Sequence, residues 1–188
     1  MRSALKAWLP LATLATLIMG TVFFTAHHVL RQTANDPQIQ LAEDWADQIN
    51  GGTDANRLNL GPFIDPARSL APFGIVYDQS GNILASSVSA PSTMKQPDGV
   101  FDTVDASAQK EARYTWRPAN GERYATVLKR VSFQDKTYYV LAGRNLREVD
   151  SRIDRMEWIL LTGWVLTLLG IAVGQHVHLV GRLVRRKK

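Results

Sequence analysis

The chain has 188 residues, a length that accommodates about one folded domain, and it contains no cysteine, which excludes disulfides and thiolate metal sites. Its formal net charge is +5, but 7 of the 22 Lys and Arg residues lie in the short tails 1–6 and 179–188, which hold no acidic residue. The other 15 lie in the middle with all 17 Asp and Glu residues. Because the basic character belongs to the tails, we expect no nucleic-acid binding.

The first element is an uncharged apolar run from Ala7 to Ala26. About 20 such residues cross the hydrocarbon core of a bilayer, and Pro10 falls in the first turns, where proline is tolerated. We predict a cytoplasmic tail over residues 1–6 and a first transmembrane helix over residues 7–28. A cleaved signal peptide is the alternative. The run is longer than the usual apolar region of a signal peptide, and Phe24 fits badly as a small residue before a cleavage site.

A second apolar run predicts a transmembrane helix over residues 158–180, followed by a basic tail, residues 181–188. The positive-inside rule then places both termini in the cytoplasm and residues 29–157 outside, which predicts a multi-pass protein of the bacterial inner membrane with a periplasmic or extracellular central domain. Small residues recur on one face of each run, which favours close packing between the spans or between two copies, although small residues are common in spans. These residues are Ala12, Thr16, Gly20, Gly163, Gly170 and Gly174.

The central domain begins with a predicted helix, capped by Asn35 or Asp36 and ended by Gly51 and Gly52. A loop, two strands, a second loop, a weak helix and three strands follow, and Asn120-Gly121 predicts a hairpin between the first two of these last strands. Hairpins imply antiparallel pairing. We therefore predict an α+β domain with an antiparallel sheet of about five strands and flanking helices. The predicted strands are 73–78, 82–88, 112–117, 123–133 and 137–145, with the weak helix at 100–111.

The last outer segment carries apolar residues spaced three and four apart, as in a heptad seam: Leu146, Val149, Ile153 and Met156. No Pro or Gly interrupts residues 146–162, so the last strand feeds a rigid helix that enters the second span. A seam of this kind predicts a parallel homodimer. Packing of an ordinary amphipathic helix on its own domain is the alternative.

This order of elements resembles the PAS-like single-Cache sensor modules that form the outer parts of bacterial sensor histidine kinases and chemoreceptors. The segment ANDPQIQLAED at residues 34–44 resembles the membrane-proximal helix of such kinases, and FGIVYDQSGNILASS at residues 73–87 resembles the first strand, turn and strand of such domains. The resemblance covers about residues 30–160. It implies a sensory input module of a two-component system, here without the cytoplasmic output domains of a kinase.

No nucleotide-binding or nucleophile motif is present, so we expect no enzyme activity and no cofactor. The four histidines are interpreted as interfacial residues and not as metal ligands, because His27 and His28 lie about 30 Å along a helix from the level of His176 and His178. In Cache-like domains the closing strands usually form the pocket. Aromatic walls with arginine suit a small anionic ligand such as a carboxylate, while ordinary sheet positions are the alternative. The candidate ligand residues are Tyr114, Trp116, Arg117, Tyr124 and Arg130, with Tyr77 and Asp78 as weaker candidates.

Two functions stay open on the sequence. The first is a two-span signalling protein whose outer domain relays a ligand or partner signal to a separate membrane-bound output protein. The second is a non-sensory accessory or assembly subunit of an envelope membrane complex.

Overall fold

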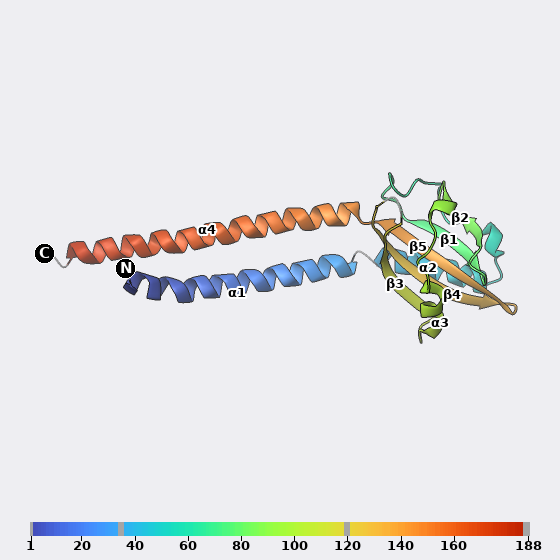
Figure 1. Cartoon of the computed structure of the whole chain (residues 1–188), viewed down its shortest axis with the longest axis horizontal. Coiled ribbons are helices and arrows are strands. Elements are labelled where there is room, and N and C mark those ends of the chain that lie inside the picture. The colour runs from blue at the N-terminus through green and yellow to red at the C-terminus, as the bar shows by residue number, and fades with distance from the viewer. Residues whose placement is uncertain (1, 34–35, 119–120, 186–188) are drawn as a thin grey trace. The chain divides into compact units, whose positions relative to one another are not determined.

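The computed structural model describes residues 2–33, 36–118 and 121–185, and it describes side chains within 8–30, 37–92, 94–118 and 121–177. The chain divides into two compact units (Figure 1). The first comprises Met1–Leu30 with Ser151–Lys188, and the second is Arg31–Asp150. The predicted cap residue Asn35 and the predicted hairpin residue Asn120 lie outside the described residues.

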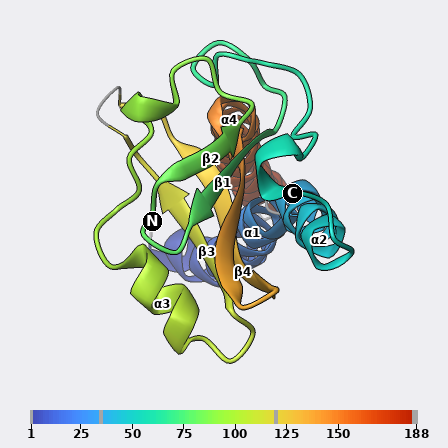
Figure 2. The ribbon, with the colours of Figure 1, turned by 90° about the vertical axis from the view of Figure 1, so that its right-hand side faces the viewer.

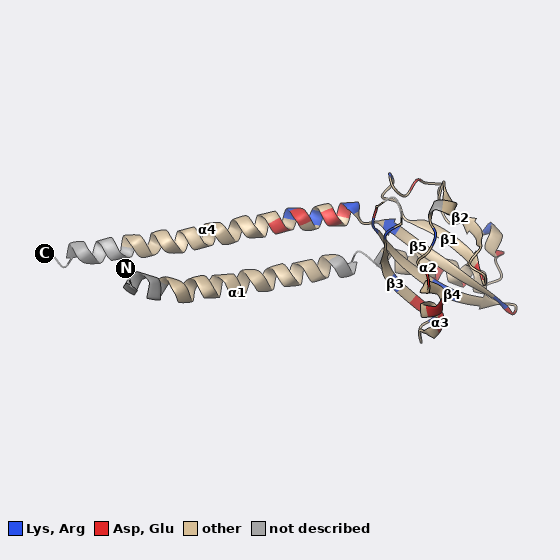
Figure 3. Cartoon of the chain, viewed as in Figure 1, with Lys and Arg blue, Asp and Glu red and all other residues tan. Residues whose placement is uncertain are grey.

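The first unit consists of two long helices, α1 at Arg2–Thr33 and most of α4 at Arg147–Arg185. Stretches of both helices, Trp8–Leu30 and Arg147–Val177, have windows of mean hydropathy 1.8, and their apolar side chains lie on the outside. Phe24 is 72% exposed and Trp158 is 69% exposed. Along the part of α4 whose side chains are described, residues 147–177, the charged residues lie in the first turns, up to Glu157 (Figure 3). Both helices are therefore long and apolar enough to cross a membrane, and their apolar faces are not covered by a protein core.

The second unit is built on a sheet with five antiparallel strands in the order β2-β1-β5-β4-β3, which confirms the predicted α+β class. The chain crosses from the edge strand β2 to the opposite edge strand β3 through the short helices η2 at Pro91–Thr93 and α3 at Val100–Ala106. The last strands form two consecutive hairpins, as predicted. The strands are β1 Phe73–Asp78, β2 Ile83–Ser86, β3 Glu111–Trp116, β4 Tyr124–Phe133 and β5 Lys136–Asn145.

Helix α2, at Asp36–Asn50, packs on one face of this sheet. Because side chains alternate along a strand, the inner strands present small aliphatic residues to α2, among them Val76, Val127 and Val140. Gly74 makes room for the ring of Trp45, since a β-carbon at Gly74 would lie 2.7 Å from that indole. The helix ends as predicted at Gly51 and Gly52: the amide of Gly52, at φ 94°, donates to the carbonyl of Ile49.

The opposite face of the sheet is covered by residues 89–110, which include α3, and Figure 2 shows α2 and α3 on the two sides of the strands. We call this second face, with its cover, the roofed face. Its core is rich in aromatic side chains, including Phe73, Tyr124 and Trp116. The cover is less helical than predicted: α3 ends at Ala106, because the chain turns through Ser107–Lys110 and Lys110 adopts φ 54°.

Candidate functional site

A buried polar chain lies inside the roofed face. Gln96, from the loop before α3, donates an amide hydrogen to the hydroxyl of Tyr77 at 2.9 Å and accepts a hydrogen bond from the hydroxyl of Tyr114. Burial raises the pKa of both phenols. Gln96 thus links the interior strand β1 and the edge strand β3 to the covering loop.

A second polar cluster holds α3 onto the sheet through Asp105. The hydroxyl of Tyr139 on β5 donates to both carboxylate oxygens of Asp105, at 3.0 and 3.1 Å. The guanidinium of Arg130 on β4 lies 3.2 Å from the same carboxylate, and Lys110 donates to the backbone carbonyl of Asp105. Burial, followed by the hydrogen bond to Asp105, raises the pKa of Tyr139. The central strand β5 and the cover are therefore joined by a charge-assisted contact.

The five predicted ligand residues do not gather at one point. Trp116 and Tyr124 are buried and lie with their ring centroids 6.0 Å apart, so they fill the core of the roofed face. Arg117 is exposed just beyond the end of β3, whereas Arg130 lies beyond the other end of that strand, where Glu111 pairs with Lys129. Six strand residues separate the two arginines by about 20 Å. A single small ligand could contact either arginine but not both.

Arg130 also lines a hollow of about 380 Å³ on the second unit, together with Lys110 and Lys129. The wall opposite comes from α2 and includes Asp47 and Asn50. The cations already have partners, because Lys129 lies 3.3 Å from Glu43 and Arg130 pairs with Asp105. An anionic ligand in this hollow would compete with those carboxylates, and the competition would loosen the contact between Arg130 and α3.

The end of β5 is joined to the start of α4 by a dense polar junction. Asn145 is buried, accepts a hydrogen bond from the backbone amide of Arg147 at 2.8 Å, and donates to the carbonyl of Pro66. The guanidinium of Arg147 donates to the carbonyls of Ala67 and Arg68. The loop at residues 66–68 and the first turn of α4 are therefore held together.

A salt bridge extends this junction to β4. Nη1 of Arg123 lies 3.0 Å from both carboxylate oxygens of Asp150, and the backbone amide of Leu146 donates to the carbonyl of Arg123. Arg144 pairs with Glu148 in the first turn of the helix. Helix α4 then continues without a Pro residue to Arg185. Its 39 residues correspond to a helix length of about 58 Å.

The predicted seam residues differ in exposure. Leu146 and Ile153 are 7% and 6% exposed within the single chain, while Val149 and Met156 are half-buried. The structure holds one chain, so the homodimer stays a prediction. Packing of this helix segment within its own chain accounts for the burial of Leu146 and Ile153.

Some of the predicted small residues bring α1 and α4 together. Ala12 is buried, Thr16 accepts a hydrogen bond from the indole of Trp164 at 3.0 Å, and a β-carbon at Gly163 would lie 3.2 Å from Met19. At Gly20, Gly170 and Gly174, nothing lies within 4 Å of where a β-carbon would be, apart from the backbone of their own helix.

Sequence reasoning missed the two residues that organise the cover, Gln96 and Asp105. Gln96 stands in a proline-flanked loop without periodicity, and Asp105 is one of many acidic residues of the domain. Tyr139 could have been found from strand alternation, since it shares a face with Leu141 and Gly143. Pairing between the cover and the sheet is a tertiary property that local spacing does not encode.

No protein-family model matches the chain, and no curated protein matches it. Among solved structures, a Mycobacterium tuberculosis transcriptional regulator aligns at 22% identity and a TM-score of 0.33, covering 44% of this chain and 32% of the other. The sensor domain of the V. cholerae histidine kinase DctB aligns at 14% identity and a TM-score of 0.32, covering 80% of this chain and 56% of the other. The chain thus spans about a third and just over half of these two proteins. Likeness at this level assigns no family.

Proposed function

We propose that this chain is a two-span inner-membrane signalling protein whose PAS/Cache-like domain lies outside the membrane and relays a signal through α4. The observation that carries the proposal is the junction at Asn145, where a central strand of the sheet passes into a 39-residue helix. The element order of the second unit also supports it, because a helix, two strands, a covering loop with a helix and three strands are what the resemblance implies.

The relay has a physical basis in strand β5. Its residue Tyr139 holds the cover through Asp105, and its last residue, Asn145, holds the first turn of α4. A ligand or partner that moves the cover therefore acts on a strand whose last residue contacts the first turn of α4. A signal of this kind needs two packed arrangements of the cover that differ in their affinity for the stimulus. A separate membrane protein would receive the output.

We propose the hollow beside Arg130 as the place of a small anionic ligand. In the full chain in detergent, a carboxylate that binds there at 100 times its dissociation constant should stabilise the outer domain by about 2.7 kcal/mol, and so raise its melting temperature. Arg130→Ala should abolish the shift and Arg117→Ala should keep it, since the two residues lie about 20 Å apart. A shift lost only in Arg117→Ala would move the site to the other end of β3.

Membrane orientation is tested independently of any ligand. Reporter fusions after Lys188 should be active only in the cytoplasm, and fusions at Gly121 only outside, because the basic tails remain inside. A cytoplasmic signal from the Gly121 fusion would contradict the proposed arrangement.

One observation favours the second function, an accessory subunit that docks on another envelope protein. Phe63 is 71% exposed and lines a second hollow of about 360 Å³ with Asn59 and Ser86. Large exposed aromatic residues beside a hollow are typical of protein contacts. A carboxylate screen without any thermal shift, combined with loss of a co-purifying partner in Phe63→Ser, would favour this function over the sensor.

A further inference from the structure

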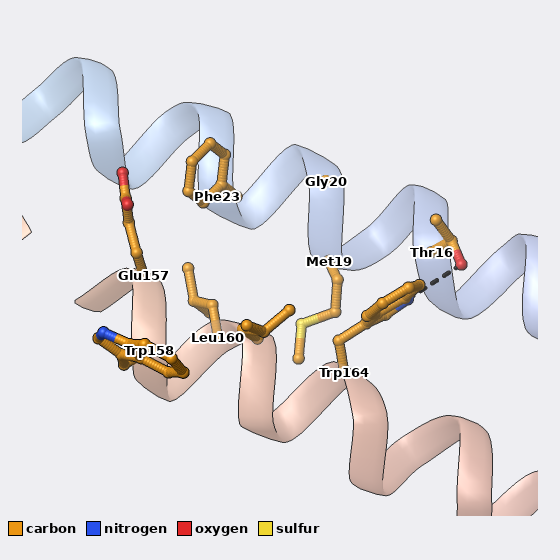
Figure 4. A pocket seen from close by; sticks show the side chains of 9 residues that line it. Thr16, Met19, Gly20, Phe23, Glu157, Trp158, Leu160 and Trp164 are labelled. Carbon is orange, nitrogen blue, oxygen red and sulfur yellow. Dashed lines mark hydrogen bonds between the residues drawn. The ribbon is translucent and has the colours of Figure 1, made fainter. Parts of the chain in front are cut away.

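The two apolar helices enclose a groove that packing of the chain itself leaves open. It has a volume of about 540 Å³, within the range of ligand pockets, and α1 and α4 each contribute one wall (Figure 4). Met19 points into it from α1, and Leu160 and Trp164 point into it from α4 (Figure 4). Among its nine lining residues, the only charged one is Glu157.

Two contacts keep the helices at a distance that preserves the groove. At one level, the indole of Trp164 donates to Thr16 and Met19 rests against Gly163. Gly20 lies on α1 between Thr16 and the end of the groove near Glu157. It adds no side chain to the α1 wall, and nothing lies within 4 Å of where its β-carbon would be. An apolar groove of this size offers dispersion contacts to an apolar occupant along its whole lining.

The outer mouth of the groove has the chemistry of an ammonium site. Oε1 of Glu157 lies 3.8 Å from Nδ1 of His27, a distance too long for a hydrogen bond, and this buried nitrogen has no hydrogen-bond partner among the described residues. A carboxylate and an unpaired imidazole nitrogen at this spacing both accept N–H donors.

We propose that the groove holds one lipid with a primary-amine headgroup. Its ammonium donates to Glu157 and His27, and its acyl chain lies against Gly20, Met19 and Trp164. A choline headgroup has no N–H donor, and a glycerol headgroup leaves the lipid with a net negative charge that Glu157 repels. The inference rests on the proposed membrane arrangement, in which Glu157 lies at the outer boundary of the second span.

Lipids brominated on the acyl chain test lipid binding in the groove directly, because bromine quenches the fluorescence of a nearby tryptophan. The full chain carrying Trp8→Phe and Trp158→Phe keeps Trp164 as its one tryptophan in the two spans, while Trp45 and Trp116 are buried in the cores of the other unit. In phosphatidylcholine vesicles, brominated phosphatidylethanolamine should reach half-maximal quenching at a mole fraction at least about threefold lower than brominated phosphatidylcholine, the preference expected of a partly exposed ion pair.

Matched variants locate the effect. Glu157→Gln should remove the preference between the two lipids, and Gly20→Leu should fill the groove and reduce quenching by both. Gly170→Leu is the control, since Gly170 also has open space around it but does not line the groove. A near-ultraviolet circular dichroism spectrum like that of the parent shows that each variant retains its folded outer domain.

Three results would overturn the proposal. Equal quenching by the two lipids in the parent would mean ordinary boundary lipid. A preference that survives both Glu157→Gln and Gly20→Leu would place the lipid elsewhere. Absence of quenching together with energy transfer between labelled copies would mean that a second chain covers the groove. None of these results alters the outcome of the reporter fusions, so failure of this inference is distinguishable from failure of the proposed orientation.

Discussion

The two faces of the sheet are built on different principles. The face under α2 is held by close-packed aliphatic side chains around Trp45, whereas the roofed face combines aromatic rings with hydroxyls, an amide and a carboxylate. Close-packed aliphatic side chains stabilise the domain and offer no second packed arrangement. A polar network that is satisfied in one arrangement specifies that arrangement, and it is also the part that a competing ligand can rearrange. On the proposed function, the α2 face supplies stability and the roofed face is the part that responds to a ligand.

The largest expected effect is on the α2 face. Trp45→Ala should lower the free energy of unfolding of the second unit by about 3–5 kcal/mol, because it empties the space between α2 and Gly74. Trp158→Ala is the matched control, since that indole is exposed, and it should change this free energy by less than about 0.5 kcal/mol. Urea unfolding of the full chain, followed by near-ultraviolet circular dichroism, measures both. Equal effects would mean that Trp45 does not anchor this core.

On the roofed face, Gln96→Leu should cost about 1–3 kcal/mol in the same measurement, because the hydroxyls of Tyr77 and Tyr114 lose their partner while buried. Replacing all three members, with Tyr77→Phe and Tyr114→Phe added, should cost less than Gln96→Leu alone, since no buried hydroxyl then stays unpaired. If the triple variant were instead the least stable, the network would contribute more than its desolvation cost and the comparison of the faces would fail.

The roofed face should also lose its structure at a lower pH than the α2 face when the pH is raised. The folded protein raises the pKa of Tyr77, Tyr114 and Tyr139 above the ordinary value of about 10. A raised folded pKa means that this stability is present below pH about 10 and is lost as the pH rises through the folded values. Hydrogen exchange should therefore increase in α3 before it increases in α2. Simultaneous loss of protection in both helices would argue against independent faces.

The smallest effect concerns the end of the roofed face, where Arg123 meets Asp150. Arg123→Gln should cost about 0.5–1 kcal/mol, because the pair is only partly exposed and Nη1 contacts both carboxylate oxygens. Its main consequence should be faster amide exchange in the first turn of α4. Lys129→Gln, which breaks the pair with Glu43 on α2, is the control and should leave that turn unchanged. Unchanged exchange in both variants would remove Arg123 from the junction.

More of the fold than of the site could be predicted from the sequence. The predicted bounds of strand β1 match the observed ones, and those of β4 and β5 match to within one residue. The order of apolar and polar residues along a strand indicates which of its side chains are buried. The long helix from β5 into the second apolar run could likewise be predicted, since neither Pro nor Gly interrupts residues 146–162. Local sequence therefore determined the elements and most of their ends.

The site depends on contacts across the fold, and the sequence carried less information about it. Trp116 and Tyr124 were expected beside a ligand because aromatic residues line pockets, yet the same property makes them core residues here. Arg117 and Arg130 were grouped by their nearness to the same hairpin, and only the register of β3 against β4 shows that they lie at opposite ends. The ligand role of these residues stays a prediction, and of the two arginines Arg130 has the surroundings that favour it.

Coupling between the roofed face and the apolar helices is the central claim, and the absence of native cysteine allows a direct measurement. Spin labels on Leu17→Cys and Leu166→Cys, both exposed positions, report the distance between α1 and α4 in the full chain in vesicles. Asp105→Ala, which releases the cover, should shift this distance distribution by about 1–2 Å, as helix shifts in signalling proteins do, whereas Glu43→Ala on the α2 face should not. Identical distributions in all three proteins, together with faster amide exchange in α3 of Asp105→Ala, would contradict the relay.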